Sequence, residues 1–211
     1  MLNTSVSTEI ANHAAGCAVA ALPVAVLGAG PVGLAAAAKL IERRMPFVIV
    51  EAASQVGAHL LDYGHVRLFS TWQKNIDMTM ARLLAATGWL APRATELPLA
   101  REVVQCVLAP FASLPAVASV LKLNTRVVSV TRERFDKAKS AGRDAAPFNI
   151  VAEERGETVV IRARAIIDST GTWGTPNPLG AAGIPARGEF AASAQIAYRI
   201  PDILGFESGT L

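Results

Sequence analysis

The chain has 211 residues, of which 52% are hydrophobic and 18% are charged, and its formal net charge is +3. This apolar composition excludes an intrinsically disordered chain, and the length is enough for one full α/β domain and part of another. The basic residues are scattered, whereas a nucleic-acid-binding surface needs them clustered, so the sequence predicts no nucleic-acid partner.

The first predicted elements form one βαβ unit. Residues 1–21 show no clear period and are expected to be a flexible leader. The apolar run 23–27 is typical of a strand that is covered on both faces. A glycine turn over 28–33, a helix over 31–44 and a second strand over 47–50 complete the unit.

The middle of the chain is less regular. Residues 54–71 contain two glycines and two histidines and are predicted to be a loop with turns. Apolar side chains at helical spacing predict helices over 75–86 and 99–108.

Beyond residue 121 the pattern changes to strands. Alternation predicts strands over 126–131, 148–152 and 157–162, and the charged run 132–144 is expected to be a solvated connection. A short apolar strand over 165–167 follows. We therefore expect an α/β fold, a Rossmann-like parallel sheet with a β-hairpin layer inserted before its last strand.

The cysteine and charge patterns indicate the cellular compartment of the chain and whether it binds a metal or a membrane. Cys17 and Cys106 are too few and too far apart for a disulfide framework or a zinc site, so no metal and a reducing, cytoplasmic location are expected. No Lys or Arg precedes Lys39, so no signal peptide is expected. The uncharged run 10–38 has the length of a membrane span, but its glycines and prolines favour a strand, a turn and a helix, so no membrane partner is expected.

The hexapeptide Gly28-Ala29-Gly30-Pro31-Val32-Gly33 matches the G-x-G-x-x-G pattern of dinucleotide-binding turns. The first glycine permits the tight turn after the strand. The second leaves room for a pyrophosphate, and the third allows the helix to pack closely on the strand. The free N–H groups and the dipole of the helix favour an anion at this place.

Glu51 ends the second strand, 18 residues after Gly33. A carboxylate there can accept hydrogen bonds from ribose hydroxyls and would repel a 2′-phosphate, which disfavours NADP at this site. The glycine pattern by itself does not separate FAD from NAD. The β-hairpin region and the later Thr170-Gly171 pair count against a plain NAD dehydrogenase, which remains an alternative.

Three segments together carry a family resemblance: PVAVLGAGPVG, FVIVE and IIDSTGTWGTPNP. Over residues 22–180 the chain resembles the FAD domain of two-dinucleotide flavoproteins, and it is most similar to flavin-containing monooxygenases and their Baeyer–Villiger relatives. The resemblance implies an FAD-dependent oxidoreductase of the monooxygenase type. In such enzymes NADPH reduces the flavin, and an oxygen atom is transferred to a small organic substrate.

The resemblance also implies which residues contact the cofactor. The glycine turn would line the pyrophosphate, Glu51 would hold the ribose, and Val127 would meet the adenine through its backbone. Thr170 and Gly171 would close over the cofactor, and Arg67, with His65, would lie near the flavin. The implied cofactor-binding set is Gly28, Gly30, Pro31, Val32, Gly33, Glu51, Arg67, Val127, Thr170 and Gly171. Tryptophans more often pack in a core than stack on a ligand, and among the three Trp72 has the best case for touching flavin or substrate. No catalytic residue is assigned.

The chain departs from the family in length and in its single glycine pattern. Residues 181–211 are interpreted as a Pro- and Gly-rich linker toward a missing NADPH-binding domain. The alternative to an oxidoreductase is therefore a non-catalytic dinucleotide-binding fragment or module that needs a partner or the missing half. A sheet truncated in this way would leave an uncovered edge, so we predict self-association, and a monomer by light scattering at high concentration would contradict it.

Overall fold

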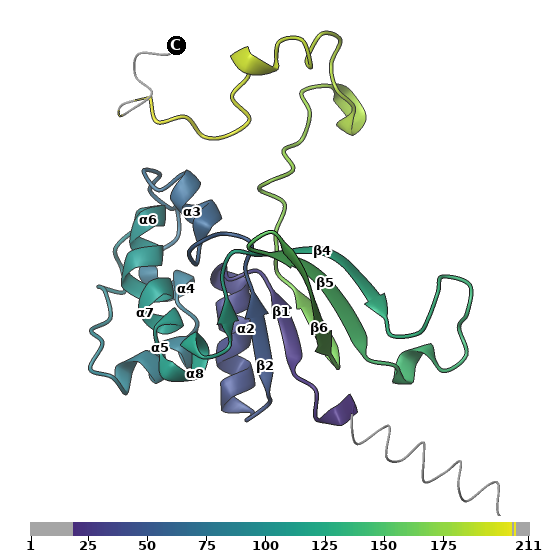
Figure 1. Cartoon of the computed structure of the whole chain (residues 1–211). Coiled ribbons are helices and arrows are strands. Elements are labelled where there is room, and N and C mark those ends of the chain that lie inside the picture. Colours follow the sequence, from purple (N-terminus) through teal and green to yellow (C-terminus); the bar gives the residue numbers. More distant parts are fainter. Residues whose placement is uncertain (1–18, 204, 206–211) are drawn as a thin grey trace, which may run out of the picture.

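The computed structural model describes residues 19–203 and 205, which contain a parallel sheet and an antiparallel sheet (Figure 1). Most of the predicted leader and Cys17 lie outside the described residues. The order of the parallel sheet is β3-β2-β1-β7, and each of its neighbouring pairs is parallel. Its strands are β1 (Val24–Leu27), β2 (Phe47–Val50), β3 (Leu121–Lys122) and β7 (Ala165–Asp168). The two-residue β3 was not predicted, because two residues are too short to show a period.

The central strand β1 is buried along its whole length because both faces of the sheet are covered. Val24 and Val26 belong to the core on the helical side. Ala25 and Leu27 pack on the other side, in a cluster that includes Ile150 of the antiparallel sheet. The predicted strand without alternation is confirmed, and double coverage is its physical cause.

The antiparallel sheet has the order β4-β5-β6 and covers one face of the parallel sheet (Figure 1). Its strands are β4 (Thr125–Arg132), β5 (Phe148–Glu154) and β6 (Glu157–Ala163). The predicted fold class, a Rossmann-like parallel sheet with an inserted antiparallel layer before its last strand, is therefore confirmed.

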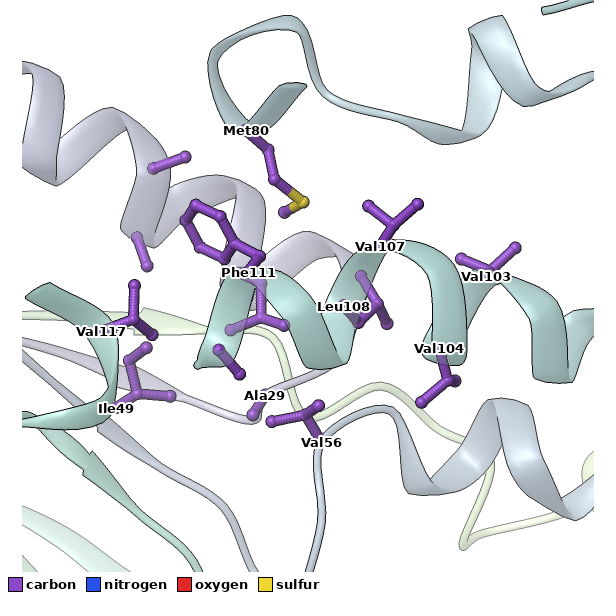
Figure 2. Packing of buried hydrophobic residues seen from close by; sticks show 14 of the residues in the cluster. Ala29, Ile49, Val56, Met80, Val103, Val104, Val107, Leu108, Phe111 and Val117 are labelled. Carbon is purple, nitrogen blue, oxygen red and sulfur yellow. The ribbon is translucent and has the colours of Figure 1, made fainter. Parts of the chain in front are cut away.

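Helices cover the other face. They are α2 (Pro31–Glu42), α3 (Ala58–Asp62), α4 (Trp72–Asn75), α5 (Met78–Ala85), α6 (Ala100–Val103), the π-helical η1 (Val104–Leu108), α7 (Ala109–Ala112) and α8 (Pro115–Ala118). Short 3₁₀ turns are η2 (Arg143–Ala145), η3 (Ala181–Gly183) and η4 (Ser193–Gln195). Figure 2 shows how Met80, Val107 and Phe111 meet in the core that these helices form against the sheet.

Two helix predictions need correction. The predicted helix 75–86 is divided, because the carboxylate of Asp77 accepts the N–H groups of Thr79 and Met80 and so begins α5 at Met78. The segment 54–71, predicted as a loop, contains α3. Its five residues are too few to display helical periodicity.

The helix predicted over 99–108 continues to residue 112 through a π-helical segment, η1. Pro110 has no N–H, so it cannot donate to the carbonyl of Cys106 as an α-helical residue would. The indole N–H of Trp89 donates to that carbonyl instead, at 2.7 Å. A side chain distant in sequence thus satisfies the group that the proline leaves without a partner.

We expect Trp89→Phe to lower the free energy of unfolding by about 1–3 kcal/mol, because the half-buried Cys106 carbonyl loses its donor. Urea unfolding of the two proteins would measure the difference. Trp173→Phe also removes an indole hydrogen bond, but an exposed one to Asp62, so it should lower the free energy of unfolding less and serves as the comparison. Equal stability of Trp89→Phe and the wild type would contradict the assignment.

After β7 the chain forms an irregular segment that extends beyond the two sheets (Figure 1). Glu189 organises it: the side chain is only 5% exposed, and its carboxylate accepts the N–H groups of Leu179 and Ala186 and the Tyr198 hydroxyl. The hydrogen bond from Tyr198 is the main cause that lowers the pKa of Glu189, and the same contact raises the pKa of Tyr198.

The chain has two tyrosines, and we expect both to titrate above the ordinary value of about 10. Burial raises the pKa of Tyr63, whereas the Glu189 carboxylate raises that of Tyr198. The Tyr198–Glu189 contact therefore persists above the pKa of Glu189 and is lost as the pH rises through the pKa of Tyr198. In a Tyr63→Phe background Tyr198 is the remaining phenol. Glu189→Gln should lower the pKa of Tyr198, which is measured by the absorbance of the phenolate during a pH titration. An unchanged midpoint would contradict this contact.

Among the described residues, no helix combines the length and apolarity that a membrane crossing requires. In the described part of the chain, β7 pairs with β1 alone, so its other edge has no strand beside it. Self-association through a sheet edge stays a prediction.

Candidate functional site

A cleft of about 690 Å³ lies at the carboxyl ends of β1, β2 and β7. The glycine turn after β1 forms its floor, the residues after β2 and at the start of β4 form one end, and α3 and the residues after β7 form the other. Ligands of open α/β sheets bind at this edge. The predicted residues in its lining are Gly28, Gly30, Pro31, Val32, Glu51, Val127, Thr170 and Gly171.

The three glycines of the turn have different surroundings. Gly28 has φ +95°, and a Cβ there would lie 2.7 Å from the Ser169 carbonyl oxygen. A Cβ at Gly33 would lie 2.0 Å from the carbonyl oxygen of Gly28, so this residue must be small for α2 to pack on the turn. A Cβ at Gly30 would meet nothing within 4 Å. The protein itself does not require glycine at position 30, and the space beside it opens into the cleft.

The N-terminus of α2 faces this space. Gly30 is its N-cap and Pro31 its first residue, and no side chain caps the helix or places an acid in its first turn. The first-turn N–H groups therefore have no partner within the helix, and no acidic side chain of the first turn compensates the positive end of its dipole. Val32 lines the cleft and is 69% exposed. This geometry suits an anionic group with an apolar neighbour.

Glu51 is held in place by the backbone. One carboxylate oxygen accepts the N–H of Ala29 at 2.7 Å, and the other accepts the N–H of Ala53 at 2.8 Å. Each oxygen keeps a second lone pair for a further donor. The carboxylate is thus fixed between the glycine turn and the end of β2, where it can accept hydroxyl hydrogens from a ligand in the cleft.

The start of β4 lies beside Glu51. The N–H of Thr125 donates to the Glu51 carbonyl at 2.9 Å, which brings Arg126 and Val127 into the lining of the cleft. The pairing of β4 with β5 is irregular between Val127 and Ser129. Val127 and Glu51 therefore line the same end of the cleft, and the contact of Val127 with an adenine stays a prediction.

The residues after β7 are fixed by side-chain hydrogen bonds. The Ser169 hydroxyl donates to the Leu27 carbonyl at 2.7 Å and so joins the end of β7 to the glycine turn. Asp168 accepts the N–H and the hydroxyl of Thr170 at 3.1 and 2.7 Å. These bonds lower the pKa of Asp168, mainly through the hydroxyl. The Ser169 hydroxyl thus has a structural role.

Three predicted positions differ from the expectation. Arg67 is not among the described residues that line the cleft, and its guanidinium donates to the Leu97 carbonyl at 2.6 Å. Trp72 is only 5% exposed and belongs to the helical core, so it has the packing role and not the ligand contact. Gly33 lies beneath the turn rather than in the lining.

His59 of α3 and Tyr63, which directly follows this helix, also line the cleft, and no sequence pattern pointed to them. The segment was read as a loop, so no pattern indicated which side chains face the sheet edge. Within the described residues, no group of three His, Cys, Asp or Glu side chains could hold a metal ion.

Comparisons with known proteins give structural matches only. No family model matches the sequence, and no curated protein matches it. Bacillithiol disulfide reductase Bdr from Bacillus cereus is 21% identical, with a TM-score of 0.54 over 76% of this chain and 42% of that one. Oxidized steroid monooxygenase bound to NADP is 19% identical, with a TM-score of 0.54 over 71% of this chain and 26% of that one.

OTEMO in complex with FAD and NADP is 21% identical, with a TM-score of 0.51 over 78% of this chain and 27% of that one. The chain thus spans well under half the length of each of these structures. At these identities the similarity shows the fold. The resemblance to two-dinucleotide flavoproteins is confirmed at that level: this chain has the fold of one part of such proteins.

Proposed function

We propose that the cleft binds FAD and that this chain is the FAD-binding part of a flavin-dependent oxidoreductase. The observation that carries the proposal is the open space beside Gly30 at the uncapped N-terminus of α2, next to the fixed carboxylate of Glu51. A pyrophosphate flanked by a ribose matches this pair of features. In this proposal residues 22–180 form the binding domain and residues 181–211 a linker.

Each part of the cleft has its own task. Backbone N–H groups after Gly30 hold the pyrophosphate, and Glu51 accepts hydrogen bonds from the adenosine ribose. Val127 lies where the adenine would end, and Thr170 and Gly171 border the opposite half of the cofactor. Bound FAD supplies the redox chemistry, and the chain binds, orients and shields it.

The monooxygenase type is the finer part of the proposal. It is supported by the sequence resemblance and by the structural similarity to steroid monooxygenase. It implies NADPH as reductant and a small organic substrate. The similarity to a disulfide reductase supports only the broader class of flavin oxidoreductases.

A second candidate is a dinucleotide-binding module without turnover of its own. The observation that favours it is that the G-x-G-x-x-G pattern occurs once within these residues. NADPH oxidation by the flavin-loaded chain would exclude this second candidate, because a module would bind FAD without oxidising NADPH.

The test is the visible absorption spectrum of the purified chain after loading with FAD and desalting. We expect a retained flavin spectrum, and Glu51→Ala should weaken FAD binding about tenfold through loss of the ribose contacts. Glu96→Ala is the matched control, since Glu96 pairs with Arg93 on the surface. A folded wild-type chain that retains no flavin, or equal binding by Glu51→Ala, would contradict the proposal.

A further inference from the structure

Four residues join α3 to the chain that follows β7; we call them the Asp62 cluster: Asp62, Tyr63, Trp173 and Arg199. Asp62 accepts the indole N–H of Trp173 at 2.8 Å and lies 3.6 Å from the Arg199 guanidinium. The rings of Tyr63 and Trp173 are tilted by 48°, with centroids 4.7 Å apart. The end of α3 thus contacts the following segment at two points that are 26 residues apart in sequence.

The Asp62 cluster borders one end of the cleft. Tyr63, directly after α3, lines it, and Gly174 and Thr175, next to Trp173, line it from the segment after β7. The end with Glu51 and Val127 lies beyond β1, because β1 separates β2 from β7 in the sheet. Backbone hydrogen bonds around Glu51 therefore hold the end of the cleft beside β2. Side-chain contacts of the Asp62 cluster hold the end beside β7.

The direction of the proposed ligand follows from this order. With the ribose at Glu51, after β2, and the pyrophosphate at Gly30, after β1, the rest of a dinucleotide continues toward β7. The flavin half would then reach the wall that Tyr63, Gly174 and Thr175 form. ADP ends at the pyrophosphate and would not extend that far.

We infer that the Asp62 cluster positions this wall and so determines how tightly the cleft holds the half of FAD beyond the pyrophosphate; the inference rests on the proposed FAD site. Asp62 is a positioning residue, because it acts through Trp173 and Arg199. A charged acceptor gives the indole hydrogen bond more strength than a neutral one would. The Tyr63–Trp173 ring contact then aligns the two sides of the wall.

The experiment compares FAD with ADP on the full chain. Titration calorimetry should show FAD binding about tenfold weaker in Asp62→Ala and in Trp173→Phe, with ADP binding unchanged. Trp173→Phe keeps an aromatic ring beside Tyr63 and removes the indole N–H that Asp62 accepts. Glu51→Ala is the contrasting variant, since it should weaken both ligands. Arg93→Ala, which breaks a surface ion pair with Glu96, is the control variant.

A second measurement, made without a ligand, tests whether Asp62 holds the segment after β7 in place. Trypsin cleavage after Arg187, an exposed residue of the segment after β7, should be faster in Asp62→Ala than in the wild type. Equal cleavage rates would overturn the positioning role. The positioning role would also be overturned if a variant lost equal affinity for FAD and for ADP. It would likewise be overturned if Asp62→Ala and Trp173→Phe both bound FAD as tightly as the wild type.

The failures of the two proposals are distinct. A wild-type chain that binds neither FAD nor ADP contradicts the proposed function, and the inference fails with it. A wild-type chain that binds FAD no more tightly than ADP leaves a nucleotide site and overturns only the role of the Asp62 cluster.

Discussion

A Gly30→Asp variant is expected to fold like the wild type and to bind FAD at least about a hundredfold more weakly. The backbone of Gly30 has φ −80°, which any residue adopts, and a Cβ there meets nothing within 4 Å. Asp is moreover a preferred N-cap, so α2 should be as stable as before or slightly more stable. The new carboxylate, however, occupies the place proposed for the pyrophosphate and repels it.

Gly30→Asn separates the charge from the size of the side chain. Asn is nearly isosteric with Asp and an equally good N-cap, so it should cause a smaller loss of FAD affinity at the same stability. Calorimetric titration and thermal unfolding of the three proteins measure both quantities. Wild-type FAD affinity in Gly30→Asp would show that no anion binds at the start of α2.

Gly33→Ala, in contrast to Gly30→Asp, should destabilise the fold. We expect a loss of about 3 kcal/mol or more in the free energy of unfolding. Its Cβ would lie 2.0 Å from the Gly28 carbonyl oxygen and 2.7 Å from the Ser169 hydroxyl oxygen. The nearest atom belongs to the backbone, so relief requires α2 to move away from the glycine turn. Urea unfolding measures the loss.

Gly174→Ala is the matched control for this prediction, because a Cβ at Gly174 meets nothing within 4 Å and its φ is not positive. It should leave the free energy of unfolding unchanged. A Gly33→Ala protein as stable as this control would contradict the packing role of the third glycine. Together, Gly30→Asp and Gly33→Ala test two separate roles of one turn, the first in FAD binding and the second in the stability of the fold.

The glycine turn was predictable because it depends only on residues that are close together in the sequence. The spacing of Gly28, Gly30 and Gly33 after an apolar run follows from the geometry of a strand, a turn and a helix. Glu51 was predictable for a related reason, since the carboxyl ends of neighbouring parallel strands meet at one edge. In the structure, its carboxylate indeed accepts the N–H of Ala29 in the turn.

Other assignments required contacts between distant segments. Trp72 could have faced a ligand or the core, and the packing of the helical layer places it in the core. Arg67 lies close in sequence to the cleft residue Tyr63, but its guanidinium binds the carbonyl of Leu97. In irregular segments no period tells which side a residue faces, so local patterns do not predict such outcomes.

By itself the sequence determined the βαβ unit, the strands of both sheets except β3, and the glycine turn with its acidic neighbour, because these depend on periodicity and on backbone geometry over short distances. The tertiary structure alone decided which side chains form the far end of the cleft. Asp62 and Trp173 are separated by 111 residues, and only the pairing of β7 with β1 brings the chain after β7 back to α3. Contacts of this kind depend on where whole elements pack, which no local pattern encodes.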